Sequence, residues 1–507
     1  MRPPLHALIQ SLQEIGKLKG IASLLGWDQE TYMPEEGIFF RAEQRALLSK
    51  LIHKKHTSPW FEKRLAKCVN LKNGTIVSRP VSKLERRLLE ETYRDWKIVK
   101  SLPASFVEAQ AKLSSESQHA WQRAKKENAF LDFLPYLKKQ IEMARKKADY
   151  LGWQESPYNA LLDEYEPGIT VAALTPLFKR LRDEIMAILR SVQGMKSSSF
   201  PSFNHYEETK QWEFGVAVLN DMGFDWKRGR QDRSVHPFTI HFHPTDVRIT
   251  TRFKANTVME GITGTIHEAG HALYEQGLDP VWFGTPLGES MSMGIHESQS
   301  RLWENHVGKS RAFWSHYFSR LKKLFPEAFS KVSLDHFYKH INAIKPGPIR
   351  VEADEVTYNL HILIRFELEA ALFEGALIPK DLPEAWREKY QNYLGITPKK
   401  DSEGVLQDIH WSMGAFGYFP SYTLGNLYAA QLFERMNQDI AVDALIEKGE
   451  LWKIKEWLNE HVHRLGRSQR PAEFIKDLTG KSISETPFLR YIRKKVAPLY
   501  PTKGFPS

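Results

Sequence analysis

The residues best suited to chemistry in this chain are His267, Glu268 and His271, which form a His-Glu-x-x-His sequence. In a helix, positions 267 and 271 lie on one face, one turn apart. Two imidazoles in that arrangement can hold one metal ion, and a glutamate beside them can take a proton from a water that the metal activates. The alternative is an ordinary amphipathic helix with two hydrogen-bonded histidines.

The surrounding sequence predicts the helix that this arrangement requires. Apolar residues recur at helical spacing between Met259 and Leu273. Thr257 and Glu260 have the spacing of a capping box at its start, and Gly277 supplies a stop. The two histidines are therefore expected on one face of a helix.

A catalytic zinc ion usually has three protein ligands and one open position, so a third ligand is needed. The best candidate is Glu297, on a second helix predicted from about Ser292 to His306 and able to pack antiparallel to the first. Competing ligands are Glu289, His296 and Glu304. A simpler interpretation is that Glu297 forms a helix-surface pair with Arg301, four residues later.

Just before the metal helix, two short segments change character. Residues 235–242 and 246–253 are rich in β-branched and aromatic residues and are joined by His243-Pro244-Thr245, which predicts a small antiparallel hairpin. A strand edge there can hold an extended peptide through main-chain hydrogen bonds. A hairpin that only covers the core fits the pattern equally well.

The remainder of the chain is predicted to be mainly helical, as a single domain over residues 1–507. Its parts are a helical N-terminal region at 1–233, the hairpin at 234–253, and a metal- and substrate-binding helical region at 254–507. Breaks are expected at Trp27 to Pro34, Pro103 and Pro135, and Thr175-Pro176 is expected to open a helix. A loop is expected at 197–202 and another at 404–422, and a helix over 349–377.

Composition narrows the function classes. The formal charge is +10 over 507 residues, and the basic residues are interspersed with acidic ones, which gives little support to nucleic-acid binding. A single cysteine, Cys68, excludes an internal disulfide framework and fits a reducing compartment. No run of about 18 apolar residues occurs, so no membrane span is expected. We therefore expect a soluble, cytoplasmic protein.

Seven motifs in order resemble the carboxypeptidase Taq family of metallocarboxypeptidases. They are Trp27-Asp28-Gln29 with Met33-Pro34, His236-Pro237-Phe238, Asp246 to Thr250, the His267 to His271 helix, His296 to Gln299, Ile349 to Asp354, and Gly404 to Trp411. The resemblance runs nearly from end to end.

The resemblance implies a large helical fold with a deep central groove and a small sheet beside the metal helix. It also implies a homodimer and a zinc-type metal held by His267, His271 and Glu297. Its activity would be removal of single C-terminal residues, with broad specificity, from peptides with a free carboxylate. The ligand types suit Zn²⁺ and also allow Co²⁺ or Mn²⁺.

Two further roles can be assigned to candidate residues. The developing oxyanion needs hydrogen-bond donors, and His410 with Tyr418, or with Tyr422, is expected to supply them from a glycine-containing loop. Tyr418 can instead be an aromatic wall of the groove.

The free carboxylate of the substrate needs a cation, and Arg350 is the candidate. It is expected at a helix N-terminus, where a guanidinium and the helix dipole both favour an anion. The alternative is a helix pair with Asp354. His236 and Arg248 are weaker candidates for shaping the groove. Residues that can orient the metal histidines are Glu352, Asp354, Gln407 and Asp408.

Two rival functions remain at this stage. A helical oligopeptidase or dipeptidyl carboxypeptidase can share the same metal helix. An inactive metal-binding scaffold is the rival from another class, but it does not need the base Glu268.

Overall fold

The computed structural model describes residues 3–78, 82–192, 194–195, 203 and 205–500. The chain divides into two compact units, each made of segments that are far apart in sequence. Unit 1 comprises Met1–Lys100, Phe200–Tyr338 and Leu432–Gly480, and unit 2 comprises Ser101–Ser199, Lys339–Gln431 and Lys481–Ser507. The predicted fold class, mainly helical with a small sheet, is confirmed.

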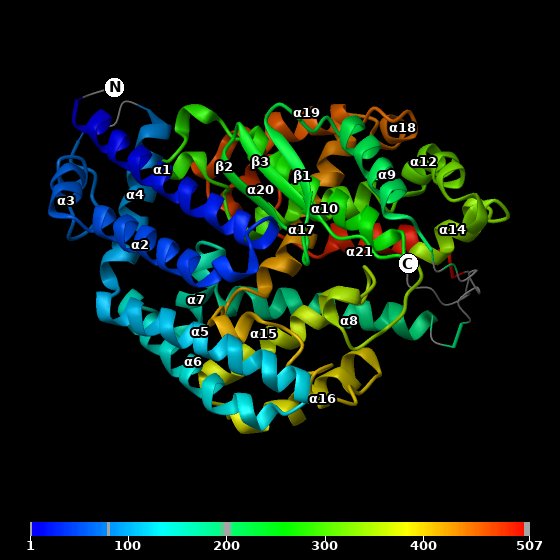
Figure 1. Cartoon of the computed structure of the whole chain (residues 1–507), viewed down its shortest axis with the longest axis horizontal. Coiled ribbons are helices and arrows are strands. Elements are labelled where there is room, and N and C mark those ends of the chain that lie inside the picture. Colours follow the sequence, from blue (N-terminus) through cyan, green and yellow to red (C-terminus); the bar gives the residue numbers. More distant parts are fainter. Residues whose placement is uncertain (1–2, 79–81, 193, 196–202, 204, 501–507) are drawn as a thin grey trace. The chain divides into compact units, whose positions relative to one another are not determined.

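Unit 1 contains the sheet and many of the helices (Figure 1). Its elements are α1 (Pro3–Thr31), α2 (Ile38–His56), α3 (Pro59–Ala66), α4 (Lys83–Ser101), α9 (Glu208–Asp221), β1 (Gly229–Arg233), β2 (Thr239–His243), β3 (Asp246–Thr251), α10 (Met259–Gly277), α11 (Met293–Arg301), a π-helical turn (Leu302–Val307), α12 (Arg311–Leu324), α13 (Pro326–Phe329), α14 (Leu334–Ile341), α18 (Val442–Glu447), α19 (Leu451–His461) and α20 (Pro471–Thr479).

The sheet has the strand order β1-β3-β2. The antiparallel pairing of β2 with β3 is as predicted, with Ile240 opposite Arg248, although β2 begins at Thr239 rather than at Val235. Strand β1 is absent from the prediction and pairs with β3 in parallel, so the small sheet is mixed and not antiparallel throughout as expected from the hairpin alone. Its sequence, Gly-Arg-Gln-Asp-Arg, lacks the apolar alternation that identifies a strand.

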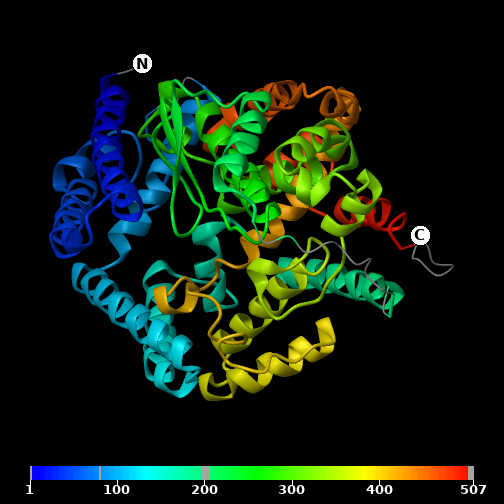
Figure 2. The same cartoon turned by 45° about the vertical axis from the view of Figure 1, so that its right-hand side comes forward.

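Helix α10 carries the His-Glu-x-x-His sequence and lies alongside the strands (Figures 1 and 2). It ends at Gly277 as predicted, but the capping box is wrong, because no side chain caps its start. Instead, Glu260 pairs with Lys254 at 2.8 Å, and Lys254 also forms a β-bridge with Thr257. Most of α10 is buried, since both the sheet and α11 pack against it.

The regular secondary structure of unit 2 is helical, and no strand is found among its described residues. Its elements are α5 (Ala104–Glu127), α6 (Phe130–Leu151), α7 (Pro157–Tyr165), α8 (Val171–Val192), α15 (Tyr358–Glu374), α16 (Leu382–Leu394), most of α17 (Pro420–Asp439) and α21 (Thr486–Val496). Helices α5 and α6 lie side by side, in cyan in Figures 1 and 2.

The break expected at Pro103 is confirmed, since α4 ends at Ser101 and α5 begins at Ala104. The break expected at Trp27 to Pro34 begins only after Thr31, where α1 ends. The break expected at Pro135 is wrong, and the helix expected to open at Thr175-Pro176 begins earlier, at Val171, so that both prolines lie inside helices, α6 and α8. Each proline lies within the first two turns of its helix, so it removes one main-chain hydrogen bond while the rest of the helix continues. The loop expected at 197–202 lies outside the described residues.

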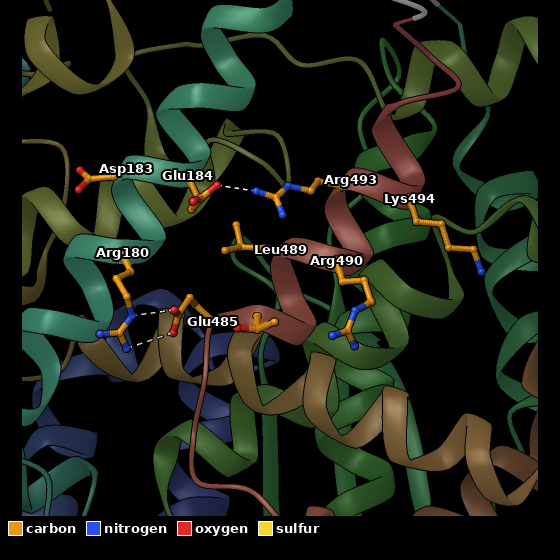
Figure 3. A pocket seen from close by; sticks show the side chains of 9 residues that line it. Arg180, Asp183, Glu184, Glu485, Leu489, Arg490, Arg493 and Lys494 are labelled. Carbon is orange, nitrogen blue, oxygen red and sulfur yellow. Dashed lines mark hydrogen bonds and ion pairs between the residues drawn. The ribbon is translucent and has the colours of Figure 1, made fainter. Parts of the chain in front are cut away.

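A cavity of about 750 Å³ opens between α8 and α21 in unit 2 (Figure 3). Opposite charges line it, and Arg180 pairs with Glu485 while Arg493 pairs with Glu184. It contains none of the residues that the sequence singled out for chemistry. Among the described residues, no helix is both long and apolar enough to cross a bilayer.

Candidate active site

Helices α10 and α11 of unit 1 bring together the three residues predicted to bind a metal. One ligand atom from each of His267, His271 and Glu297 lies within 4.8 Å of the others. Oε2 of Glu297 is 3.5 Å from Nε2 of His271 and 3.9 Å from Nε2 of His267. Two imidazoles one turn apart and a carboxylate from the next helix thus converge on one point.

A glycine between the two histidines permits this convergence. A Cβ at Gly270 would lie 2.7 Å from the carbonyl oxygen of Gln299 and 2.7 Å from Cα of Ser300. Real Cβ atoms essentially never approach backbone so closely. The main chains of α10 and α11 therefore meet here, beside the carboxylate of Glu297.

The carboxylate of Glu297 is held by its own helix. Its Oε1 accepts a 2.6 Å hydrogen bond from Nε of Arg301, and its Oε2 accepts one of 3.1 Å from Oγ of Ser300. Burial acts to raise its pKa, but Arg301 and the two histidines outweigh burial and hold the pKa of Glu297 far below its usual value. The Arg301 pair considered from the sequence exists, and it orients the carboxylate within the cluster.

The two histidines differ at their second ring nitrogen. Nδ1 of His267 lies 2.9 Å from Oε2 of Glu304, which lies in the π-helical turn that follows α11. Such an outer carboxylate fixes the ring orientation of a metal-binding histidine. Nδ1 of His271 is buried and without a hydrogen-bond partner, and burial lowers the pKa of His271 to about 3.

The donor set fits a catalytic divalent metal. Two neutral imidazole nitrogens and one ionised carboxylate are the ligands that zinc takes in this class of site, with a position left for water. The other candidate ligands have different partners. Glu289 pairs with Lys19 and Arg467, and His296 contacts Glu275 at 2.8 Å. Glu304 contacts Nδ1 of His267, the ring nitrogen that faces away from Glu297.

Glu268 lies on α10 next to the candidate metal-binding cluster and is buried, with 7% of its surface exposed. Its Oε2 accepts a 2.7 Å hydrogen bond from Oγ1 of Thr239 on β2, and the same hydroxyl lies 2.8 Å from the main-chain oxygen of Glu268. Burial raises the pKa of Glu268 above its usual value, against the effects of His267 and Thr239. Strand β2 thus restrains the carboxylate beside the candidate metal ligands.

We expect Thr239→Val to lower kcat about tenfold, with metal content unchanged, because valine keeps the shape of threonine but frees the Glu268 carboxylate to rotate. Steady-state kinetics with metal analysis measures this. Thr263→Val is the matched control, because the hydroxyl of Thr263 bonds to Met259 on α10 and does not contact Glu268. Equal kcat in the two variants would contradict the role of Thr239.

His236 and Arg248, the two weaker substrate candidates, lie near the sheet in unit 1. His236 is exposed in the segment before β2. Arg248 on β3 forms two hydrogen bonds with Asp246 and lies with its guanidinium carbon 4.2 Å from the ring centre of Trp27. Arg248 therefore links the Trp27 motif to the sheet, and a substrate role for it stays a prediction.

The prediction that a helix begins at Arg350 is wrong. Residues Arg350–Glu352 form a 3-10 turn, and α15 begins at Tyr358. Asp354 lies in the turn that leads into α15, where its Oδ1 accepts hydrogen bonds from the main-chain N–H groups of Val356 and Thr357. The expected combination of a helix dipole with the Arg350 guanidinium is therefore absent, and so is the expected pair of Arg350 with Asp354.

Arg350 is held in unit 2 by a different acid. Asp408 accepts hydrogen bonds of 2.9 and 2.8 Å from Nε and Nη2 of Arg350, and its other oxygen accepts one of 2.7 Å from Arg365. Nη1 of Arg350 donates to the hydroxyl of Tyr358. These bonds use one N–H on each guanidinium nitrogen, so Nη1 and Nη2 each keep a second hydrogen. The guanidinium is 5.1 Å from the ring centre of Tyr422.

His410 and the two tyrosines expected beside it lie together in unit 2. Nε2 of His410 is 3.2 Å from the hydroxyl of Tyr422, whereas Tyr418 packs ring to ring against His410, Tyr422 and Tyr165. Burial lowers the pKa of His410 to about 3, so the ring is neutral near pH 7 and one ring nitrogen carries a hydrogen. The site thus offers one imidazole and two phenols as donors.

Asp408 and Gln407 are candidates from the sequence for orienting the metal histidines. Both lie in unit 2 and contact Arg350 instead, and Oε1 of Gln407 accepts a 2.8 Å hydrogen bond from the main-chain N–H of Arg350. The roles of Thr239 and Glu304 were missed, although Glu304 was considered as a ligand. The spacing of Glu304, two turns beyond Glu297, was the one available signal, and nothing in the sequence distinguished Thr239.

Comparison with known proteins identifies the family whose sequences match this chain. A family model described as "Carboxypeptidase Taq (M32) metallopeptidase" matches residues 7–496. Thermostable carboxypeptidase 1 of Thermus thermophilus is 40% identical over 509 residues, covering 97% of this chain and 98% of the relative. Carboxypeptidase 1 of Bacillus subtilis is 40% identical over 492 residues, covering 96% and 97%.

Solved structures agree over the same length. The M32 carboxypeptidase from Deinococcus radiodurans R1 matches with a TM-score of 0.95 at 35% identity, covering 99% of this chain and 100% of that one. Metallocarboxypeptidase 1 of Trypanosoma cruzi matches with a TM-score of 0.92 at 32% identity, covering 97% and 99%.

Proposed function

Because the chain belongs to the Carboxypeptidase Taq (M32) metallopeptidase family, whose members are peptide hydrolases, we propose that it removes single C-terminal residues from peptides with broad specificity. The observation that carries this proposal is the cluster of His267, His271 and Glu297 with Glu268 adjoining it. A pure metal-binding scaffold would have no use for that base.

In this proposal His267, His271 and Glu297 hold the metal, with Zn²⁺ preferred and Co²⁺ or Mn²⁺ also compatible. When bound, the metal would lower the pKa of a water molecule and polarise the scissile carbonyl. Glu268, steadied by Thr239, takes the proton of the attacking water and passes it to the departing amine. Arg301 and Glu304 keep the ligand side chains in position during the reaction.

His410 and Tyr418, or Tyr422 in its place, are proposed to donate hydrogen bonds to the oxyanion of the tetrahedral intermediate. A neutral imidazole and a phenol are suitable donors, because neither loses a proton near pH 7. His236 and Arg248 are proposed to contact the peptide more weakly. The family resemblance also supports a homodimer. The single cysteine, the buried Cys68, supports a location in the reducing cytoplasm.

Arg350 is proposed to bind the free carboxylate of the substrate with the hydrogens that remain on Nη1 and Nη2. Arg350→Ala should lower kcat/KM for peptides with a free C-terminus about 10²-fold, because a charge-assisted contact is lost. The loss on amidated peptides should be smaller. The ratio of the two is the measurement, since it does not depend on how much of the variant is folded.

Arg387→Ala provides the control, because Arg387 is a partly exposed arginine of unit 2 that pairs with Asp401. It should leave both substrates unaffected. Equal losses on free and amidated peptides in Arg350→Ala would remove Arg350 from the anchor role.

The proposed reaction is tested by digesting a mixed peptide set with metal-depleted and metal-reconstituted protein and following the products by mass spectrometry. A ladder of single-residue losses from the C-terminus, seen only with metal, is the expected result. Loss of dipeptides or internal fragments would instead favour a dipeptidyl carboxypeptidase or an oligopeptidase. Absence of any cleavage with metal bound would favour a scaffold.

A further inference from the structure

Glu369, on α15 of unit 2, is a fully buried carboxylate with no place in the mechanism above. Its Oε1 accepts a 2.7 Å hydrogen bond from the indole N–H of Trp411. Its Oε2 accepts one of 2.6 Å from the hydroxyl of Tyr158 and one of 2.9 Å from the main-chain N–H of Gly417. All three donors are neutral.

Two of these three donors belong to the segment that carries the proposed oxyanion donors. Trp411 directly follows His410, and Gly417 directly precedes Tyr418. One carboxylate therefore holds the segment at both ends, through a side chain at one end and the main chain at the other. The third donor, Tyr158, belongs to α7 and ties the carboxylate to the core.

Gly417 sits in a conformation that few other residues adopt. Its φ is +86°, and a Cβ there would lie 2.8 Å from the main-chain carbon of Leu161. This position lets the Gly417 N–H point at Glu369 while the next residue, Tyr418, packs its ring on His410 at a centroid distance of 5.3 Å. The backbone at the Tyr418 end is thus shaped around the carboxylate.

Keeping a carboxylate at this depth has a cost, because burial disfavours its charge. Burial raises the pKa of Glu369 to about 7, against the three hydrogen bonds and the charge of Arg365. A core that needed only to be filled would be served better by an apolar side chain. The hydrogen bonds that Glu369 accepts from the N–H groups of Trp411 and Gly417 explain why an acid is kept at this position.

We propose that Glu369 is a positioning residue that sets His410 and Tyr418 in their working arrangement by holding Trp411 and Gly417. This inference rests on the proposed function of His410 and Tyr418. Loss of the anchor at one end would let the segment shift, and a displacement of about 1 Å at a catalytic donor can reduce turnover on the order of 10²-fold.

The test is Glu369→Gln, which keeps the size of the side chain. A carboxamide has one accepting oxygen, so its NH₂ group must face either the Trp411 N–H or the Gly417 N–H, and one of those bonds is lost. We expect kcat to fall roughly 10- to 100-fold, with KM and metal content little changed. Glu367→Gln, two residues earlier on α15 and paired with Lys389, should keep wild-type kcat.

Tyr158→Phe separates positioning from simple core packing. It removes the Tyr158 hydroxyl while leaving both bonds to the 410–418 segment, so kcat should stay close to wild type. If Tyr158→Phe lost as much kcat as Glu369→Gln, the effect would be a general one on the core and the proposal would fail.

Hydrogen–deuterium exchange over residues 410–419 provides a measurement independent of activity. Exchange in this segment should be faster in Glu369→Gln than in wild type or Glu367→Gln. Unchanged exchange would overturn the positioning role. Faster exchange together with full activity in His410 and Tyr418 variants would preserve the anchor and overturn the proposed oxyanion donors instead.

Discussion

Glu268→Gln is expected to lower kcat about 10²- to 10⁴-fold while metal binding persists, because the carboxamide cannot accept the proton of the attacking water. The change is nearly isosteric, and the amide oxygen can still accept the hydrogen bond from Thr239. The proposed ligands His267, His271 and Glu297 are unchanged. Single-turnover assays with metal analysis on the same sample measure both quantities.

Glu260→Gln is the matched control for this variant. Glu260 lies in the first turn of α10 and forms an ion pair with Lys254. The control alters a carboxylate on the same helix without touching the metal-binding cluster, so its kcat should equal that of wild type. Activity of Glu268→Gln comparable to wild type would show that another group is the base.

His271→Ala is expected to remove the metal and, with it, the activity. The variant leaves one imidazole and one carboxylate, two ligands where a catalytic site needs three. Glu304→Gln offers a graded comparison, because it leaves all three candidate ligands in place and weakens the hydrogen bond to Nδ1 of His267, along with the ion pairs of Glu304 with Arg301 and Lys309. It should reduce metal affinity about 10- to 100-fold. His271→Ala should lose more than that. Competition with a chelator of known affinity gives both values.

His316→Ala controls for the loss of a histidine, since His316 contacts a main-chain oxygen at Glu447 and lies outside the cluster. Its metal affinity should match wild type. If His271→Ala bound metal as tightly as Glu304→Gln, then His271 would not be a ligand.

The local sequence was enough to predict the α10 helix and its packing partner, because helical spacing and a glycine stop are encoded within a few residues. Glu297 could be chosen because it lies on the very next helix. Strand β1 could not be found, since it is polar and its partner β3 follows after an intervening strand. The pairing of β1 with β3 forms only when the folded chain brings the two strands together.

Other misses have the same origin. The helix expected from Arg350 begins only at Tyr358, after a turn in which Asp354 accepts main-chain hydrogen bonds, and the acid that binds Arg350 lies 58 residues away in sequence. Glu369 is one of several acids on a helix, and its importance comes from Trp411 and Gly417, which only the folded chain brings to it. The roles of these residues depend on burial and on hydrogen bonds between segments far apart in the chain, and neither produces a pattern in the local sequence.

The close approach at Gly270 changes how specific the metal sequence is. As usually written, His-Glu-x-x-His leaves two positions open to any residue. In this chain the second of them cannot hold even an alanine without pushing α11, and therefore Glu297, away from the histidines. The first, Ala269, is completely buried. Four or five of the five letters are thus constrained, so His-Glu-Ala-Gly-His would be expected by chance far less often than the three-letter pattern.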